Sequence, residues 1–307
     1  MKMGKNKTLK SVDLFCGCGG MSFGFQSAGV KVMAAFDNWQ PAVDTYNHNF
    51  SHEAKREDIS QPSFLELVKG LKPDLISGGP PCQDFSIAGK RDGDGSRANM
   101  TLIYSQIVAK VRPRWFVMEN VYNIEKFPVL KEALKVFKEA GYGVSKRVVD
   151  ASYVGVPQMR RRYFVIGRLG VNDGFLDALL DGGLSQERTS VREYLGDSLG
   201  TEYYYMHPRS YNRRAIFSVD EPSATIRGVN RPMPGSYKKH PADKTADFKR
   251  VRSLSSAERA MIQTFPASYV FKGTKSAVEQ MIGNAVPVRL AEYVAKAIVS
   301  FEASSND

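Results

Sequence analysis

The α/β character of this chain begins with the stretch Ser11-Val12-Asp13-Leu14-Phe15-Cys16-Gly17-Cys18-Gly19-Gly20. Its first five residues have the apolar character of a buried strand, and the glycines after them predict a turn. The amphipathic stretch 21–28 then predicts a helix, which ends at Gly29. A strand, a glycine-rich turn and a helix bring backbone N–H groups close to a cofactor, although ordinary strand-to-helix joints also contain glycines.

The alternation of strand and helix continues to about residue 170, which predicts an α/β fold with a doubly wound, largely parallel sheet. Further strands are predicted at 30–36, 57–59, 73–76, 114–118, 144–150 and 162–166. Helices are predicted at 41–49, 64–68, 100–111 and 127–140. Such sheets bind ligands at the carboxyl ends of their strands, where we expect Asp37, Asp58, Cys82 and Glu119. Asp37 follows the glycines by about 20 residues, the spacing of ribose-binding acids in nucleotide-binding folds.

A lone cysteine follows two prolines in Ser77-Gly78-Gly79-Pro80-Pro81-Cys82-Gln83. Proline fixes its own φ and restricts the residue before it, so the backbone that leads to Cys82 is nearly rigid. This rigidity suits a thiol that must meet an electrophile. A free cysteine is nevertheless more often a small buried hydrophobe, so the sequence around it leaves both interpretations open.

The composition, 42% hydrophobic and 24% charged residues, is that of a soluble globular protein. A chain of 307 residues is long enough for one large and one small domain. No apolar run has the length of a membrane span and no secretion signal is present, so we expect a cytoplasmic protein. Cys16, Cys18 and Cys82 should be reduced, and none has the spacing of a zinc site. His48 and His52 lack the glutamate of a zinc helix, so we expect no metal.

Positive charge gathers in one segment of the chain. The net charge is +11, and residues 201–260 hold 12 basic and 6 acidic side chains, more than half of the excess. From about residue 170 Gly, Pro, Tyr and Arg become frequent, which predicts a smaller, loop-rich domain. Helices return at 255–264, where Ser255 and Glu258 form a capping pattern, and at 288–301. Such a basic segment indicates a polyanion-binding surface, most simply for nucleic acid, or else a merely solvated basic face.

Six short motifs occur in an order that resembles the DNA (cytosine-5) methyltransferase family, over almost the whole chain. They are Asp13-Leu14-Phe15-x-Gly17-x-Gly19-Gly20, Pro80-Pro81-Cys82-Gln83, Glu119-Asn120-Val121, Gln158-x-Arg160-x-Arg162, Arg252-x-Leu254-Ser255-x-x-Glu258 with Phe265-Pro266, and Gly283-Asn284-Ala285-Val286-Pro287. In length the chain resembles the compact bacterial modification enzymes of this family. The resemblance implies a Rossmann-like S-adenosylmethionine-dependent methyltransferase sheet. It implies a catalytic and cofactor-binding domain at 1–197 plus 276–307, and a target-recognition domain at 198–275.

The resemblance implies S-adenosyl-L-methionine as the methyl donor. The contacts it implies are with Phe15, Gly17, Gly19, Gly20, Asp37, Asn38, Asp58, Ile59, Pro80, Asn284 and Ala285. Asp37 would bind the ribose, and Asp58 with Ile59 the adenine. Two residues depart from the family pattern, because Asp37 stands where the family usually has Glu and Asn38 where it usually has Ile or Trp.

The chemistry of cytosine explains why these residue types are needed. Carbon 5 is a poor nucleophile until a thiolate adds to carbon 6, and Cys82 is the candidate nucleophile. A cysteine is little ionised near neutral pH, so Arg160 or Arg162 nearby would favour its thiolate. Glu119 is the candidate general acid at N3 of the base, and Arg162 would stabilise charge at O2.

Double-stranded DNA is the partner that the resemblance implies, with the target cytosine flipped out of the base stack. The glycine-rich stretch 84–99 is then a candidate lid over the flipped base, or a simple surface loop. Candidate DNA contacts are Gln83, Ser86, Arg97, Thr225, Arg227 and Arg231. We expect a monomer and no membrane partner, and the sequence leaves open a cognate restriction endonuclease encoded nearby.

Three other functions compete with this one. An RNA (tRNA) cytosine-5 methyltransferase shares nearly all the motifs, but its family usually has a smaller insertion in place of the basic 201–260 segment. A catalytically silent DNA-binding protein would not need Cys82, Glu119 and Arg162 together. A dinucleotide oxidoreductase would explain the glycines and Asp37 but none of the other motifs.

Overall fold

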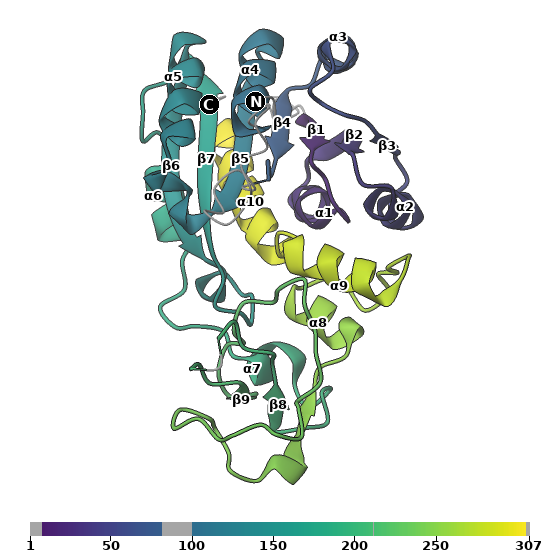
Figure 1. Ribbon diagram of the computed structural model, residues 1–307. Coiled ribbons are helices and arrows are strands. Elements are labelled where there is room, and N and C mark those ends of the chain that lie inside the picture. Colours follow the sequence, from purple (N-terminus) through teal and green to yellow (C-terminus); the bar gives the residue numbers. More distant parts are fainter. Residues whose placement is uncertain (1–7, 82–99, 211, 305–307) are drawn as a thin grey trace, which may run out of the picture.

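The computed structural model describes residues 8–81, 100–210 and 212–304 (Figure 1). A large sheet with helices on both faces forms the upper part of the molecule, and a three-stranded sheet lies below it. Helices α8 (Ser256–Ile262) and α9 (Lys275–Asn284) lie between the two sheets. Within the described ranges no helix is long and apolar enough to cross a membrane.

The large sheet has seven strands in the order β3-β2-β1-β4-β5-β7-β6. They are β1 (Lys10–Leu14), β2 (Lys31–Asp37), β3 (Ala54–Arg56), β4 (Leu75–Gly78), β5 (Trp115–Val121), β6 (Tyr142–Asp150) and β7 (Arg161–Leu169). Strands β3, β2, β1, β4 and β5 are mutually parallel, and β7 is antiparallel to both β5 and β6. The prediction of a largely parallel, doubly wound sheet is therefore confirmed.

The strand predicted at 57–59 is wrong, because β3 lies at Ala54–Arg56. The Asp58 carboxylate accepts hydrogen bonds from the backbone N–H and the hydroxyl of Ser60, at 2.9 and 2.7 Å. This local turn replaces the extended backbone, as is usual for Asp followed by a polar residue.

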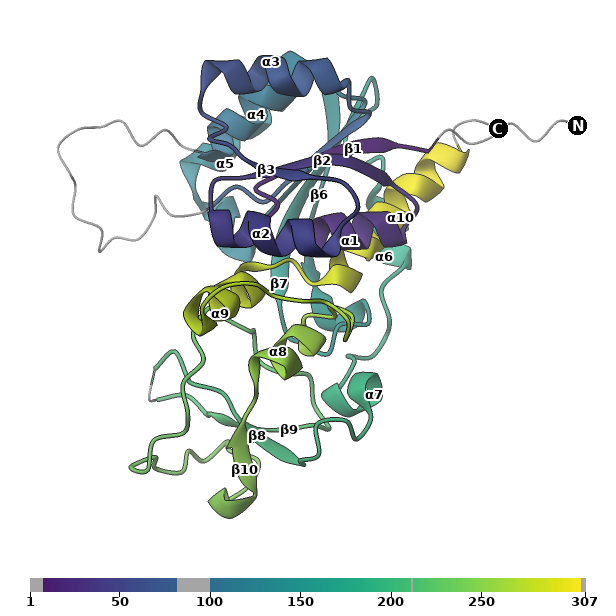
Figure 2. The same ribbon diagram turned by 90° about the vertical axis from the view of Figure 1, so that its right-hand side faces the viewer.

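Helices cover both faces of the large sheet (Figure 2). One face packs against α1 (Gly20–Ser27), α2 (Gln40–Asn49), α6 (Asp177–Gly182) and α10 (Val288–Ser304). The other packs against α3 (Pro62–Leu71), α4 (Met100–Val111) and α5 (Pro128–Glu139). Short 3-10 helices are η2 (Tyr122–Lys126), η3 (Ala151–Tyr153) and η4 (Phe248–Arg250). The two faces give two separate cores, so the sheet is buried on both sides.

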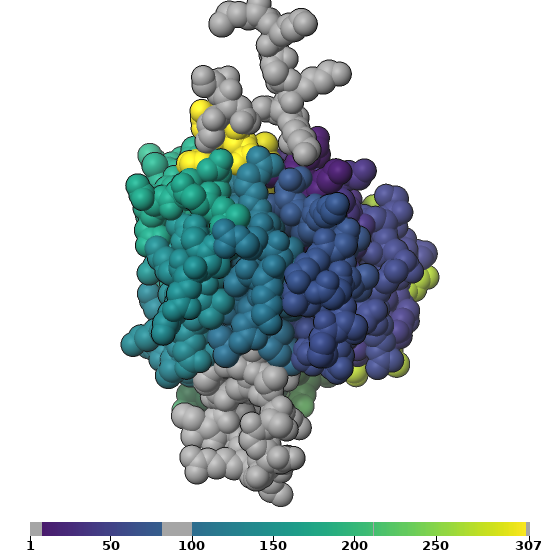
Figure 3. All heavy atoms as spheres, turned by 90° about the horizontal axis from the view of Figure 1, so that it is seen from above, coloured from purple at the N-terminus to yellow at the C-terminus, as the bar shows by residue number. Residues whose placement is uncertain are grey.

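The amino ends of the central strands are joined to the end of α10. The backbone N–H of Lys10 donates to Asp74, which forms an ion pair with Arg114 at 3.5 Å. Arg114 contacts Glu302 at 2.6 Å, and the indole of Trp115 donates to the same carboxylate. Figure 3 shows the result, with the yellow end of α10 beside the purple start of β1.

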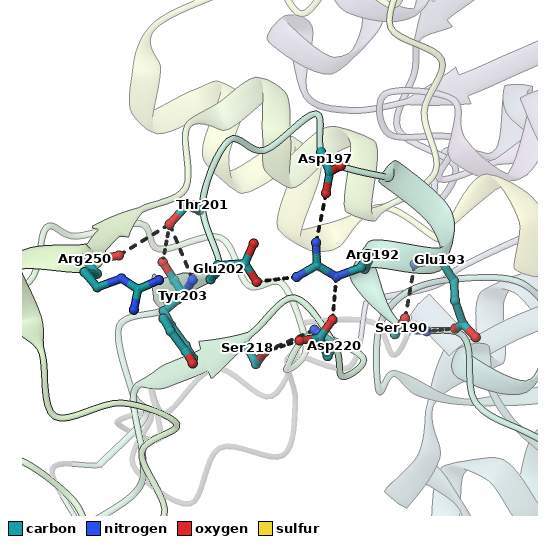
Figure 4. A network of polar contacts seen from close by, with 10 residues as sticks. All are labelled: Ser190, Arg192, Glu193, Asp197, Thr201, Glu202, Tyr203, Ser218, Asp220 and Arg250. Atoms are coloured by element: carbon teal, nitrogen blue, oxygen red, sulfur yellow. Dashed lines mark hydrogen bonds and ion pairs between the residues drawn. The ribbon is translucent and has the colours of Figure 1, made fainter.

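The small lobe, defined here as residues 191–253, contains a sheet of three short strands in the order β10-β8-β9. They are β8 (Tyr203–Tyr205), β9 (Ile216–Ser218) and β10 (Val251–Ser253), which the sequence did not predict. Figure 4 shows how Arg192, in helix α7 (Val191–Leu195), contacts three carboxylates of this lobe. They belong to Asp197, Glu202 and Asp220. One guanidinium thus joins α7 to the segments that flank β8 and β9.

Candidate active site

The carboxyl ends of neighbouring parallel strands bring the candidate residues to one edge of the large sheet. Asp37 is the last residue of β2, and Glu119 lies two residues before the end of β5. Strand β4 ends at Gly78, just before the Gly79-Pro80-Pro81 approach. Ligands of doubly wound sheets bind at this edge.

The turn after β1 is held by the side chain of Asp37. One carboxylate oxygen accepts the N–H of Gly17 at 2.8 Å, and the other accepts the N–H of Trp39 at 2.9 Å. Burial raises the pKa of Asp37, and these two N–H groups oppose the rise. Phe15 begins the turn with a φ of 58°, a left-handed conformation that costs energy for a side chain of this size. Such strain is typical of functional turns.

A hollow of about 470 Å³ opens at the carboxyl ends of β2 and β3, lined by Asn38, Arg56, Glu57, Asp58 and Gln61. Its volume lies within the usual range for small-molecule sites, about 300–1,000 Å³. Hydrogen bonds from Ser60 lower the pKa of Asp58, which keeps this carboxylate ionised. Carboxylate and amide groups bind ribose hydroxyls and an adenine amino group well, so the residues present fit S-adenosylmethionine.

The predicted cofactor residue Ile59 is placed differently from Asp58. Its side chain is buried in the core that also contains Phe36 and Phe64. Any contact with a ligand in the hollow would therefore involve the backbone of Ile59.

The turn at the end of α9 packs against the turn after β1. A Cβ built on Gly20 would lie 2.2 Å from the carbonyl oxygen of Val286, so only glycine permits this approach. Asn284 is exposed and Ala285 is half-buried. Two segments far apart in the sequence thus lie together, and the cofactor contacts implied for Gly19, Gly20, Asn284 and Ala285 stay a prediction.

Glu119 and Arg162 form an ion pair across the antiparallel pairing of β5 with β7. Arg162 Nε lies 2.8 Å from Glu119 Oε1, and only 8% of Glu119 is exposed. Burial raises the pKa of Glu119, while Arg162 and then Arg160 act in the opposite direction. A carboxyl group with a raised pKa is suited to proton donation near neutral pH.

The segment Gly79-Pro80-Pro81, which precedes Cys82, lies beside the pair of Glu119 and Arg162. A Cβ built on Gly79 would lie 3.2 Å from Glu119 Oε2. The side-chain amide of Asn120 donates to the carbonyl of Pro80 at 3.0 Å. Strand β5 therefore contacts the backbone two residues before Cys82. Four predicted residues, Cys82, Gln83, Ser86 and Arg97, lie outside the described residues, and so does the stretch 84–99.

Arg160 makes contacts that the sequence did not indicate. It is 1% exposed, and its guanidinium donates to the carbonyls of Ile226, Gly283 and Ala285 at 2.9–3.0 Å. Burial lowers its pKa, with a further contribution from Arg162. Arg160 thus joins the segment around Ile226 to the turn after α9, and its catalytic role stays a prediction.

Gln158 is a residue of the site region that the sequence analysis quoted without a role. Its side chain accepts the N–H of Ile226 at 2.8 Å and donates to Gln263 at 2.7 Å. Gln263 in turn donates to the carbonyls of Ile282 and Ala285. The alternation Gln158-x-Arg160 could have indicated that Gln158 acts together with Arg160, because residues two apart on an extended chain point to the same side.

Among the candidate DNA contacts at 225–231, Arg227 lies near two further arginines of the small lobe, Arg209 and Arg213. Thr225 donates its hydroxyl to the carbonyl of Met159 at 2.7 Å. Arg227 donates to the carbonyl of His207, and partial burial followed by the charges of Arg209 and Arg213 lowers its pKa. Arg231 is exposed. Partial burial lowers the pKa of His207, and the charges of Arg231 and Arg227 lower it further.

This chain is similar to proteins of one known family. Residues 9–300 match the family described as C-5 cytosine-specific DNA methylase. Type II methyltransferase M.HindV of Haemophilus influenzae is 52% identical over 296 residues, which cover 96% of this chain and 97% of that protein. Type II methyltransferase M.HgiDI of Herpetosiphon aurantiacus is 49% identical over 294 residues, 95% of each. The crystal structure of S. pombe Dnmt2 methyltransferase has the same fold, with a TM-score of 0.72 and 20% sequence identity. The match covers 98% of this chain and 100% of that one.

Proposed function

This chain belongs to the C-5 cytosine-specific DNA methylase family, and from that membership we propose a specific mechanism and target for its DNA (cytosine-5) methyltransferase activity. The target is a cytosine flipped out of a short specific sequence in double-stranded DNA. The observation that carries the proposal is the buried Glu119–Arg162 pair, which lies beside the Gly79-Pro80 approach to Cys82 and at the same strand edge as the cofactor hollow.

Covalent catalysis by Cys82 is the first part of the mechanism. The Cys82 thiolate adds to carbon 6, which forms a C–S bond and moves an electron pair toward carbon 5 and N3. Glu119 donates a proton or hydrogen bond at N3, and Arg162 stabilises charge at O2. After carbon 5 gains its methyl group, loss of its proton and departure of the thiolate restore the ring.

S-adenosylmethionine supplies the methyl group when it is bound. The ribose hydroxyls would contact Asp37, and the adenine would contact Asp58 and Asn38 in the hollow. The Gly17–Gly20 turn and the Asn284-Ala285 turn would form the wall on the other side. The contact between Gly17 and Asp37 supports this assignment, because it holds the turn after β1 at the end of β2, next to Asn38 of the hollow.

Loss of the Asp37 carboxylate is expected to weaken cofactor binding. Asp37→Ala removes two acceptors of backbone N–H groups and one ribose partner, so the Kd for S-adenosylmethionine should rise by about 10- to 100-fold. Isothermal titration calorimetry measures this directly. The control is Asp44→Ala, which removes an exposed carboxylate of α2 outside the hollow and should leave the Kd unchanged. An unchanged Kd for Asp37→Ala would contradict the assignment of the ribose contact to Asp37.

Residues 198–275 are proposed as the target-recognition domain, with Arg227 as a residue that reads a base. An arginine discriminates guanine by two hydrogen bonds worth about 1–3 kcal/mol, whereas a phosphate contact carries no sequence information. Arg227→Ala should therefore relax the target preference. Lys238→Ala, which changes an exposed residue of the same segment, should weaken binding to all sequences alike. Methylation rates on a set of duplexes with single base-pair changes would test this. A preference unaltered by Arg227→Ala would exclude Arg227 as a residue that reads a base.

The single experiment for the function as a whole is bisulfite sequencing of plasmid DNA from cells that express the protein. Modified cytosines within one short sequence are the expected result, and it would identify that sequence. Modified tRNA with unmodified plasmid would favour the RNA methyltransferase instead. The 52% and 49% identity to Type II methyltransferases supports DNA as the substrate and a restriction-modification system as the setting. A cognate endonuclease, a monomeric state and a cytoplasmic location belong to the same proposal.

A further inference from the structure

Two buried arginines bind the backbone of residues 226–229 from the inside. Arg160 donates to the carbonyl of Ile226 at 2.9 Å. Arg259, in α8, donates to the carbonyl of Arg227 and lies 3.4 Å from the carbonyl of Val229. Because these carbonyls point inward, the segment is fixed while its outer surface stays accessible, and Val229 is 46% exposed.

Arg259 is in turn fixed by Glu279 of α9. The two side chains form an ion pair, and each is only 4% exposed. Glu279 Oε1 also accepts hydrogen bonds from Ser256 at 2.7 Å and from Asn230 at 3.0 Å. A buried charge is tolerated only with such partners, so Glu279 determines where the guanidinium of Arg259 lies.

Asn230 closes this arrangement at the far end of the segment. Its amide group donates to Glu279 and, at 2.9 Å, to the carbonyl of Leu254. Residues 227–230 are therefore joined to α8, to α9 and to the chain that leads into α8. The opposite side is fixed by packing, because a Cβ on Gly283 would lie 2.1 Å from the backbone nitrogen of Gly228.

We propose that the Arg259–Glu279 pair, with Asn230, is a positioning device that sets the choice of DNA sequence. These residues do not contact DNA themselves. They fix the backbone that carries Arg227 and Arg231, and two hydrogen bonds to a base edge require that backbone to lie within about 0.5 Å of the correct place. The inference rests on the proposed function of residues 198–275 and adds the residues that determine its accuracy.

Arg259→Lys and Asn230→Ala are the variants that test the device. Lysine keeps the positive charge beside Glu279 but lacks the planar fork that reaches the carbonyl of Arg227. Asn230 is only half-buried, so its replacement should leave the fold intact. The control is Arg192→Gln, because Arg192 contacts three carboxylates of the same lobe (Figure 4) and none of these belongs to residues 226–231.

The readout is the ratio of methylation rates on the target duplex and on duplexes with one changed base pair. Both test variants should lower this ratio by about tenfold or more at one or two positions. Their single-turnover rates on saturating target duplex should stay within about threefold of the wild type, and Arg192→Gln should keep the wild-type ratio. Circular dichroism melting of each variant confirms that it is folded.

An unchanged ratio in folded Arg259→Lys and Asn230→Ala would overturn the inference, and so would an equal loss of rate on every duplex. Either result would leave the proposed function intact, because the wild type would still methylate its target. Wild-type protein that methylates no duplex at all would overturn the proposed function, and the inference with it.

Discussion

Replacement of Cys82 by alanine is expected to stop methyl transfer, with the rate falling by about 10,000-fold or more. The physical reason is that carbon 5 of cytosine gains electron density only after a thiolate has added to carbon 6. The other two cysteines cannot substitute for Cys82. Burial raises the pKa of Cys16 well above its ordinary value and that of Cys18 to about 12, so both stay protonated and unreactive.

The same prediction can be checked by isolating the covalent intermediate. A fluorine at carbon 5 blocks the final elimination, so duplex DNA with 5-fluorocytosine should accumulate a complex that resists denaturation. Mass spectrometry should locate the attached nucleotide on the peptide that contains Cys82. An adduct on the peptide with Cys16 and Cys18, or full activity of the alanine variant, would contradict the mechanism.

Glu119→Gln is expected to slow the chemical step by about 100- to 10,000-fold, the usual effect of losing one acid–base group. Glutamine preserves the size of the side chain and an oxygen for Arg162, so DNA and cofactor binding should remain. Single-turnover kinetics with saturating DNA measures the chemical step alone. Glu125→Gln is the matched control, because Glu125 is an exposed carboxylate in the 3-10 helix directly after β5.

The raised pKa of Glu119 adds a pH dependence to this prediction. A general acid works only in its protonated form, and the protonated fraction falls as pH rises through the pKa. The wild-type rate should therefore decline with rising pH on this limb, and a higher pKa moves the decline to higher pH. The residual rate of Glu119→Gln should lack this limb. A variant that keeps the rate and the pH profile of the wild type would exclude Glu119 as the acid.

Local patterns predicted most helices and strands of the large sheet. The helix predicted at 100–111 is α4 (Met100–Val111), and the pattern at Ser255 and Glu258 is a capping box in which each residue binds the backbone of the other. Such features depend on residues close in sequence. The three-residue strands of the small lobe escaped prediction because they are too short to show an alternating pattern, and β10 also pairs with a distant partner, as when Tyr204 pairs with Arg252.

Helix α9 shows a different limit of prediction from the sequence. Thr274 caps its first turn, a signal that was present in the sequence but is weak alone. The burial of Glu279 could not be foreseen, since a glutamate in a helix is normally solvated and only the packing of α8 on α9 encloses it. In the site, the strand-end positions of Asp37 and Glu119 followed from the alternating pattern. The contacts of Arg160 with Ile226 and Gly283 required the tertiary structure.

The packing of α10 on α1 affects how the protein folds during synthesis. Gly24 of α1 lies so close to α10 that an added Cβ would be 2.4 Å from the carbonyl of Val288, and α10 completes the core on that face of the sheet. A growing chain makes α1 long before α10, so the core between α1, the sheet and α10 stays incomplete until about 270 further residues have been added. Contacts this distant in sequence are slow to form, and the open core exposes apolar surface meanwhile. The core on this face of the sheet should therefore close only once α10 has been made.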